Sequence, residues 1–98
     1  MNDKILALII AAANDLNQKL ENKIPIDRGV DAPLYGQEGV LDSLGLVSLL
    51  VSVEQSIEDQ HHVKLTLADE RAMSQKRSPF QTIGSLVEYV ARLMRNGA

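Results

Sequence analysis

One stretch of the chain, residues 39–54, constrains the fold more than any other. A polar pair, Asp42 and Ser43, ends a segment rich in glycine and proline and precedes a long, mostly apolar run. Aspartate is a favoured N-cap, because its carboxylate accepts hydrogen bonds from the free amides of the first helical turn. The pair therefore predicts a helix that begins at Ser43 with Asp42 as its cap. Ser43 as the cap itself is the alternative.

The position of Ser43 also suggests chemistry. Its hydroxyl is expected beside the positive end of the helix dipole. A phosphate ester on that hydroxyl would lie close to unpaired backbone amides, where anions are favoured. Ser43 is therefore the residue at which we expect a modification.

The predicted helix runs from Ser43 to about Gln60 and carries two apolar stripes. With 3.6 residues per turn, one stripe is expected to face the core; it consists of Leu46, Leu49, Leu50, Val53 and Ile57. The second stripe consists of Leu44, Val47 and Val51. Because a small domain has one core, the second stripe is either covered by another segment or forms a docking surface for partner proteins.

Two more helices are predicted, one near each end of the chain. Asn2 or Asp3 caps the first, in which apolar residues recur every three or four positions: Leu6, Ile9, Ala13, Leu16 and Leu20. Its apolar run, residues 5–13, is shorter than the ~20 residues that span a bilayer. The single lysine before it is offset by Asp3, which makes a weak positive region for a signal peptide. Thr82 caps the last helix, whose buried side is expected to be Ile83, Leu86, Val87, Val90, Leu93 and Met94.

The connections between these helices are long. Residues 21–41 are expected to pack on the helices as a loop, anchored by Ile24, Ile26, Val30, Leu34, Tyr35 and Val40. In residues 61–67, apolar and polar residues alternate as they do in a β-strand. No partner strand is predicted elsewhere in the chain, so we interpret this segment as an extended connector. A short helical turn at 68–73 and a polar loop with Lys76, Arg77 and Pro79 follow. The sequence thus predicts one all-α domain, residues 1–98, with three main helices, a short third helix and a long first loop.

Composition and spacing argue against several classes of function. The 98 residues include no cysteine, which excludes thiolate zinc sites and cysteine nucleophiles and fits a cytoplasmic protein. A net charge of −3 without a basic stripe argues against nucleic acid as a partner. His61 and His62 are adjacent and point apart, so we interpret them as solvated histidines at a helix end and expect no metal site. They are also too far along the helix to activate Ser43, so an enzyme is not expected.

The tripeptide Asp42-Ser43-Leu44, opening an apolar helix after a long loop, resembles the modification site of acyl and peptidyl carrier proteins. The resemblance runs from about Leu34 to Met94; it includes residues 41–45, the apolar pattern through Ile57, and Thr82-Ile83 with Tyr89-Val90 in the last helix. It implies the four-helix bundle of that family. It also implies that a phosphopantetheinyl transferase attaches 4′-phosphopantetheine from coenzyme A to Ser43.

The resemblance further implies that the thiol arm carries an acyl or aminoacyl group as a thioester. A loading enzyme supplies the group, and downstream synthases or transferases use it, so the protein provides an anchor and a recognition surface. Leu44, Val47 and Val51 match the positions that partner enzymes contact in the family.

Fatty-acid carriers are acidic along the second helix, whereas this chain has Gly45, Ser48 and Gln55 there and a basic segment at 76–80. These differences favour a free-standing, monomeric carrier of a specialised biosynthetic pathway; the alternative is an unmodified helical interaction module.

Overall fold

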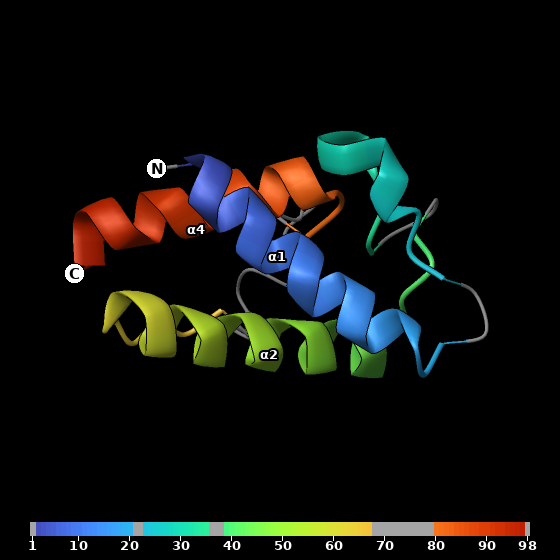
Figure 1. Cartoon of the computed structure of the whole chain (residues 1–98), viewed down its shortest axis with the longest axis horizontal. Coiled ribbons are helices and arrows are strands. Elements are labelled where there is room, and N and C mark those ends of the chain that lie inside the picture. Colours follow the sequence, from blue (N-terminus) through green and yellow to red (C-terminus); the bar gives the residue numbers. More distant parts are fainter. Residues whose placement is uncertain (1, 21–22, 36–38, 68–79, 98) are drawn as a thin grey trace.

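The computed structural model in Figure 1 describes residues 2–20, 23–35, 39–67 and 80–97. Within these ranges no β-strand is present, and the chain forms only two isolated β-bridges. The helical elements follow in the order α1 (Asn2–Asn17), η1 (Ile26–Asp31), α2 (Ser43–His61) and α4 (Ile83–Gly97), where η1 is a 3-10 helix. The described part of the chain is therefore all-α, as predicted.

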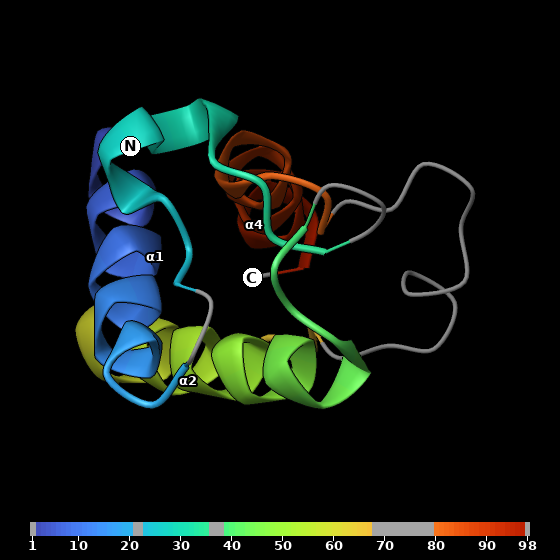
Figure 2. The same cartoon turned by 90° about the vertical axis from the view of Figure 1, so that its right-hand side faces the viewer.

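Helix α1 is the central element of the arrangement. It crosses between α2 and α4 and packs against both, and η1 packs against α1 and α4 (Figure 1). The backbones of α2 and α4 do not come into close contact, and they lie on two sides of an interior that side chains fill (Figure 2). Across the described ranges, we find no helix with the length and apolar content that a membrane span requires.

The core is a single cluster of mainly aliphatic side chains. On α2 the first stripe is completely buried, as predicted. Phe80, which the sequence placed in the polar loop before the last helix, is also completely buried. Its ring packs edge-to-face on Tyr89 with centroids 5.7 Å apart. Phe80 thus belongs to the core, because the backbone before α4 pairs with the loop: the Phe80 carbonyl accepts a hydrogen bond from the Tyr35 amide at 3.1 Å.

The buried face of α1 is wider than predicted. Ile9 and Ala13 are buried as expected, but Leu6 and Leu16 are only half-buried. Three apolar residues outside the predicted stripe are also buried: Ile5, Leu8 and Ala12. The reason is that α1 contacts α2, α4 and η1 together, so it buries more than the one stripe of a helix that packs on a single neighbour.

Helix α1 ends at Asn17 and does not continue through Leu20 as the periodicity predicted. The buried side chain of Asn17 pairs with the backbone of Ile24: its Nδ2 donates to the Ile24 carbonyl at 3.0 Å, and its Oδ1 accepts from the Ile24 amide at 2.8 Å. The Lys23 ammonium donates to the Asn17 carbonyl at 2.9 Å. These bonds stop the helix and return the chain to the core at Ile24.

The loop after α1 packs on the helices, as predicted, but contains the unpredicted helix η1. Gly29, with φ 64° and ψ −129°, adopts a conformation within η1 that side-chain-bearing residues rarely take. Beyond η1, an isolated antiparallel bridge joins Pro33 to Thr82. Among the predicted anchors Ile24 and Leu34 are buried, whereas Val30 is exposed, contrary to expectation.

The start of α4 is capped at Thr82, as predicted. The Ser85 amide donates to Thr82 Oγ1, and the Thr82 amide donates to Ser85 Oγ, both at 3.0 Å. This reciprocal pair satisfies two donors at the helix start. On the buried side of α4, Leu93 and Met94 are only half-buried, while the other four predicted residues are buried.

The segment after α2 is extended and has no strand partner in the described part of the chain, as expected of a connector. It ends at buried Leu67, whose amide donates to Glu54 Oε1 of α2 at 2.6 Å. The predicted helical turn at 68–73 and the polar loop with Lys76, Arg77 and Pro79 lie outside the described residues.

Candidate functional site

The junction that leads into α2 is centred on Asp42. Its backbone is extended, with φ −85° and ψ −177°, and its Oδ1 accepts a hydrogen bond from the Gly45 amide at 2.7 Å. The Asp42 carbonyl accepts from the Leu46 amide at 2.9 Å, which closes the first helical turn. Asp42 is therefore the N-cap and Ser43 the first helical residue, so the alternative with Ser43 as the cap is wrong. The side chain of Ser43 lies outside the described residues.

The loop holds this junction through its backbone. The Leu41 amide donates to the Leu34 carbonyl at 2.9 Å, next to an isolated parallel bridge between Tyr35 and Leu41. Leu41 itself is buried. A Cβ atom at Gly39 would lie 2.5 Å from the Leu34 carbonyl oxygen, so only glycine fits where the two backbone segments meet. The start of α2 is thus fixed by contacts with residues 34 and 35.

Gly45 contributes a second close approach at the junction. A Cβ atom there would lie 3.2 Å from both Asp42 Oδ1 and Leu41 Cδ2. The missing side chain lets the capping carboxylate and the buried leucine close over the first turn.

The second stripe of α2 is exposed at its two ends. The side chain of Leu44 is 77% exposed and that of Val51 is 40% exposed, while Val47 is half-buried. Within the described ranges, no segment covers Leu44 or Val51. The exposed residues between and beside them are uncharged: Ser48, Ser52 and Gln55. The N-terminal half of α2 thus presents an apolar and neutral polar surface directly after Ser43.

The two histidines differ from each other in the structure. His62 is exposed and ends α2 in a left-handed conformation, φ 56° and ψ 32°, with its amide donating to the Glu58 carbonyl. His61 is half-buried, and its Nε2 atom is buried without a hydrogen-bond partner within the described ranges. The prediction of a solvated histidine is thus wrong for His61, because α2 reaches that residue while packed against α1.

His61 lines a hollow of about 460 Å³ between α1 and the end of α2, together with Lys4, Ala7, Leu8, Ala11 and Gln60. Ser43 and His61 are the first and last residues of α2, so about 27 Å of helix separates them. The histidine cannot act as a base for Ser43.

In the described segments, no group of three or more metal-ligating side chains comes together.

Comparison of the chain with protein-family models, with curated proteins and with solved structures finds no match. Function is therefore inferred from two features: the capped junction at Asp42 and Ser43, and the exposed stripe that follows it.

Sequence reasoning missed one contact that shapes the opposite side of the molecule. A Cβ atom at Gly84 of α4 would lie 2.9 Å from the Val30 carbonyl oxygen of η1. The two residues are far apart in the chain, and no local periodicity connects them. A glycine in the first turn of the last helix was the available signal, because glycine is uncommon inside helices unless a neighbour approaches closely.

Proposed function

We propose that this chain is a phosphopantetheine carrier domain with the four-helix bundle of the acyl- and peptidyl-carrier type. In this proposal Ser43 carries the 4′-phosphopantetheine arm, and Leu44, Val47 and Val51 form the surface that partner enzymes contact. The observation that carries the proposal is the junction: Asp42 caps α2, and Ser43 is its first residue beside the highly exposed Leu44.

The attachment point suits a phosphodiester. The first turn of a helix stabilises negative charge, because its amides lack intrahelical acceptors and the helix dipole is positive there. Asp42 uses Oδ1 to bind the Gly45 amide, which fixes where the helix begins. Residues 34 and 41 hold the incoming loop by a backbone hydrogen bond. These contacts give an incoming transferase a defined helix start at Ser43.

The residues of the chain would anchor the bound group and form the surface that partner enzymes recognise. The group itself supplies a terminal thiol, which carries a thioester. An exposed leucine next to the attachment point offers a partner enzyme an apolar anchor. Val51 lies two helical turns further along the same side, so the two side chains mark a ridge about 10 Å long. The uncharged residues around this ridge favour a carrier of a specialised pathway over a fatty-acid carrier, which is acidic along this helix.

The competing function is a helical interaction module that is never modified. The exposed Leu44 and Val51 suit that function as well, because a docking surface requires no arm. The two proposals differ in one respect only, the fate of the Ser43 hydroxyl.

Intact-mass spectrometry after incubation with coenzyme A and a broad-specificity phosphopantetheinyl transferase tests the proposal. We expect a mass increase of one phosphopantetheine group, which tandem mass spectrometry assigns to Ser43. Ser43→Ala should abolish the increase. Ser48→Ala and Ser52→Ala are matched controls on the same helix and should gain the group as the unaltered protein does.

Two results would contradict the proposal. One is an unchanged mass with a transferase that modifies a known carrier in the same reaction. The other is assignment of the group to Ser48 or Ser52. The first result would favour the interaction module.

A further inference from the structure

The exposed side of α2 carries no charge over most of the helix. Residues 43–53 contain no aspartate, glutamate, lysine or arginine, although the chain has 10 basic and 13 acidic residues. The first charged side chain of α2, that of Glu54, is half-buried, and its Oε1 accepts from the Leu67 amide at 2.6 Å. The first exposed charge on α2 is therefore that of Glu58.

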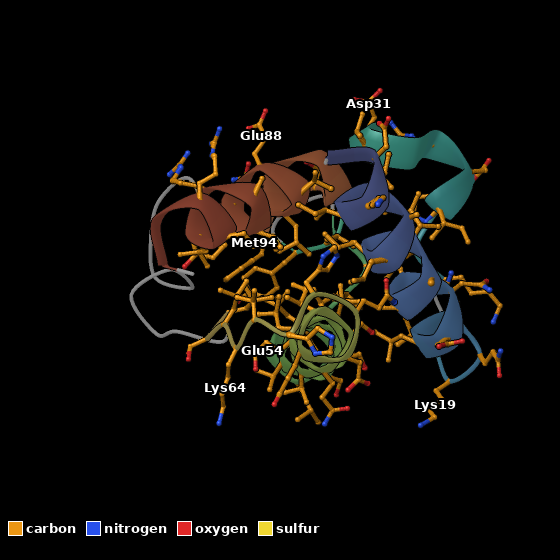
Figure 3. All side chains as sticks on the ribbon, turned by 60° about the vertical axis from the view of Figure 1, so that its left-hand side comes forward. Lys19, Asp31, Glu54, Lys64, Glu88 and Met94 are labelled. Carbon is orange, nitrogen blue, oxygen red and sulfur yellow. The ribbon has the colours of Figure 1, made fainter. Side chains whose placement is uncertain are left out.

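The exposed residues in this part of α2 form one face. Their spacing of three and four positions places them on one side of the helix, and we call them the outer face: Leu44, Ser48, Val51, Ser52 and Gln55. In Figure 3, which looks nearly along α2, α1 and α4 lie on one side of this helix, and side chains extend from its other side away from them. The outer face is thus a continuous uncharged surface about 16 Å long.

Charged residues border the outer face at its two ends. Asp42 precedes it, and Glu58 and Asp59 follow it; all three are exposed. A protein–protein interface has this composition, because its centre is depleted of charged residues and its rim is polar. A surface that only faces water commonly carries charges of both signs throughout. The distribution along α2 therefore fits a face whose centre a partner covers.

The position of the outer face next to Ser43 decides which occupant fits it. Under the proposed function, a transferase must bring its active site to the Ser43 hydroxyl, and Leu44, the next residue of the helix, is 77% exposed. An enzyme that reaches Ser43 therefore lies over the start of the outer face. A second copy of this chain seated on Leu44 would instead obstruct Ser43. The occupant that the proposed function requires is thus the modifying enzyme.

The absence of charge decides how that enzyme binds. Covering Leu44 and Val51 removes aliphatic surface from water, which favours association. The outer face has no charged side chain that would have to lose its water, and none that would attract an oppositely charged surface. Apolar burial is therefore the driving force that this face offers.

We infer that the enzyme that modifies Ser43 docks on the outer face of α2 with an apolar contact surface and without charge pairs. The partner that fits this chain is thus a transferase whose own contact surface is apolar and uncharged where it covers Leu44, Ser48 and Val51. The inference rests on the proposed function, since it describes how the transferase recognises the chain.

Opposite charges at one position test the inference. Ser48 lies in the middle of the outer face and is exposed, so Ser48→Glu, Ser48→Lys and the neutral Ser48→Gln differ mainly in charge. The probe is the broad-specificity transferase with coenzyme A. We expect both charged variants to lower kcat/KM at least about fivefold relative to Ser48→Gln, because either charge loses water against an apolar surface. The two losses should agree within about twofold, since no charge on the enzyme distinguishes them.

Controls separate docking from stability and from long-range attraction. Glu88 of α4 is exposed and lies across the molecule from α2 (Figure 3), so Glu88→Gln and Glu88→Lys change the net charge without altering the outer face. Both should keep kcat/KM within about twofold of the unaltered chain, because the Debye length is about 10 Å at 0.1 M salt. Leu44→Ala removes the apolar anchor and should lower kcat/KM at least about fivefold. Thermal unfolding of every variant should match that of the unaltered chain, because each altered side chain is exposed.

Three results would overturn the inference while the modification of Ser43 stands. Opposite effects of Ser48→Glu and Ser48→Lys would identify a charged contact surface on the enzyme. Equal rates for the three Ser48 variants would show that the enzyme does not cover the outer face. A dimer of the unaltered chain that Leu44→Ala dissociates, measured by sedimentation velocity, would identify a second copy as the occupant. If the unaltered chain gains no phosphopantetheine, the proposed function and the inference fail together, so the two failures are distinguishable.

Discussion

The two apolar stripes of α2 consist of the same kinds of side chain but have opposite environments. The first stripe, Leu46, Leu49, Leu50, Val53 and Ile57, is completely buried. In the second stripe, Leu44 and Val51 are exposed and Val47 is half-buried. Both stripes belong to one helix, so helix propensity and dipole are common to them. The difference arises only from which neighbours pack against each side.

The contrast shows which side chains stabilise the fold and which remain accessible to a partner molecule. Burying the first stripe stabilises the domain by the transfer of aliphatic surface out of water. Leu44 gives up most of that stabilisation, because little of its surface is covered. Under the proposed function, this exposed aliphatic surface is the place where a partner enzyme docks. Substitutions on the two stripes should therefore have opposite consequences for folding and for binding.

Leu50→Asp is expected to have the largest effect. Leu50 is completely buried, so the change places an unpaired carboxylate in the core and should destabilise the domain by more than about 4 kcal/mol. Chemical denaturation followed by circular dichroism measures this loss. Leu50→Met, which nearly conserves the volume, should cost less than about 1.5 kcal/mol and serves as the control. A cooperative, near-normal transition for Leu50→Asp would contradict the assignment of this stripe to the core.

The loss of stability caused by Val47→Asp should lie between the losses expected for substitutions in the buried first stripe and at the exposed positions of the second. The side chain is half-buried, so part of a carboxylate loses water without gaining a partner, and we expect a loss of about 1–2 kcal/mol in the free energy of unfolding. The same denaturation experiment measures it. A loss as large as that of Leu50→Asp would assign Val47 to the core and shorten the proposed recognition surface. Val47→Thr keeps the shape and should show a smaller loss.

Asp42→Ala tests the junction that sets the register of both stripes. Loss of the cap to Gly45 should cost about 1 kcal/mol, whereas Asp42→Asn keeps an acceptor and should cost only a few tenths. Ser43→Ala leaves the cap in place and should be the milder change. Thermal and denaturant unfolding of the three variants give the ranking. A larger loss for Ser43→Ala than for Asp42→Ala would contradict the cap assignment.

Leu44→Asp and Val51→Asp should have the smallest effect on folding. Both side chains are exposed, and surface substitutions usually change stability by less than about 0.5 kcal/mol. Under the proposed function they should instead slow acyl or aminoacyl transfer between the loaded carrier and its partner enzyme, because an apolar anchor becomes charged. Paired melting curves and transfer assays measure both effects. Ser52→Asp, a charge on a neighbouring exposed position, controls for the added charge alone.

The long loop between α1 and α2 could be predicted only in part from the sequence. Its packing on the helices could be predicted, because its apolar residues had no other way to leave water. The helix η1 could not be predicted, because it has no apolar periodicity and includes Gly29 at a positive φ. The burial of Phe80 was also missed, since one aromatic residue beside a basic segment gives no local sign of the core that it enters.

The sequence by itself determined the features that depend on neighbours in the chain. The caps at Asp42 and Thr82, the start of α2 at Ser43 and the two stripes all follow from hydrogen bonds and periodicity within a few residues. Tertiary structure alone decided which stripe is buried, how wide the face of α1 is, and that His61 Nε2 is buried. The physical reason is that burial depends on which distant segments pack together, and no local pattern encodes that choice.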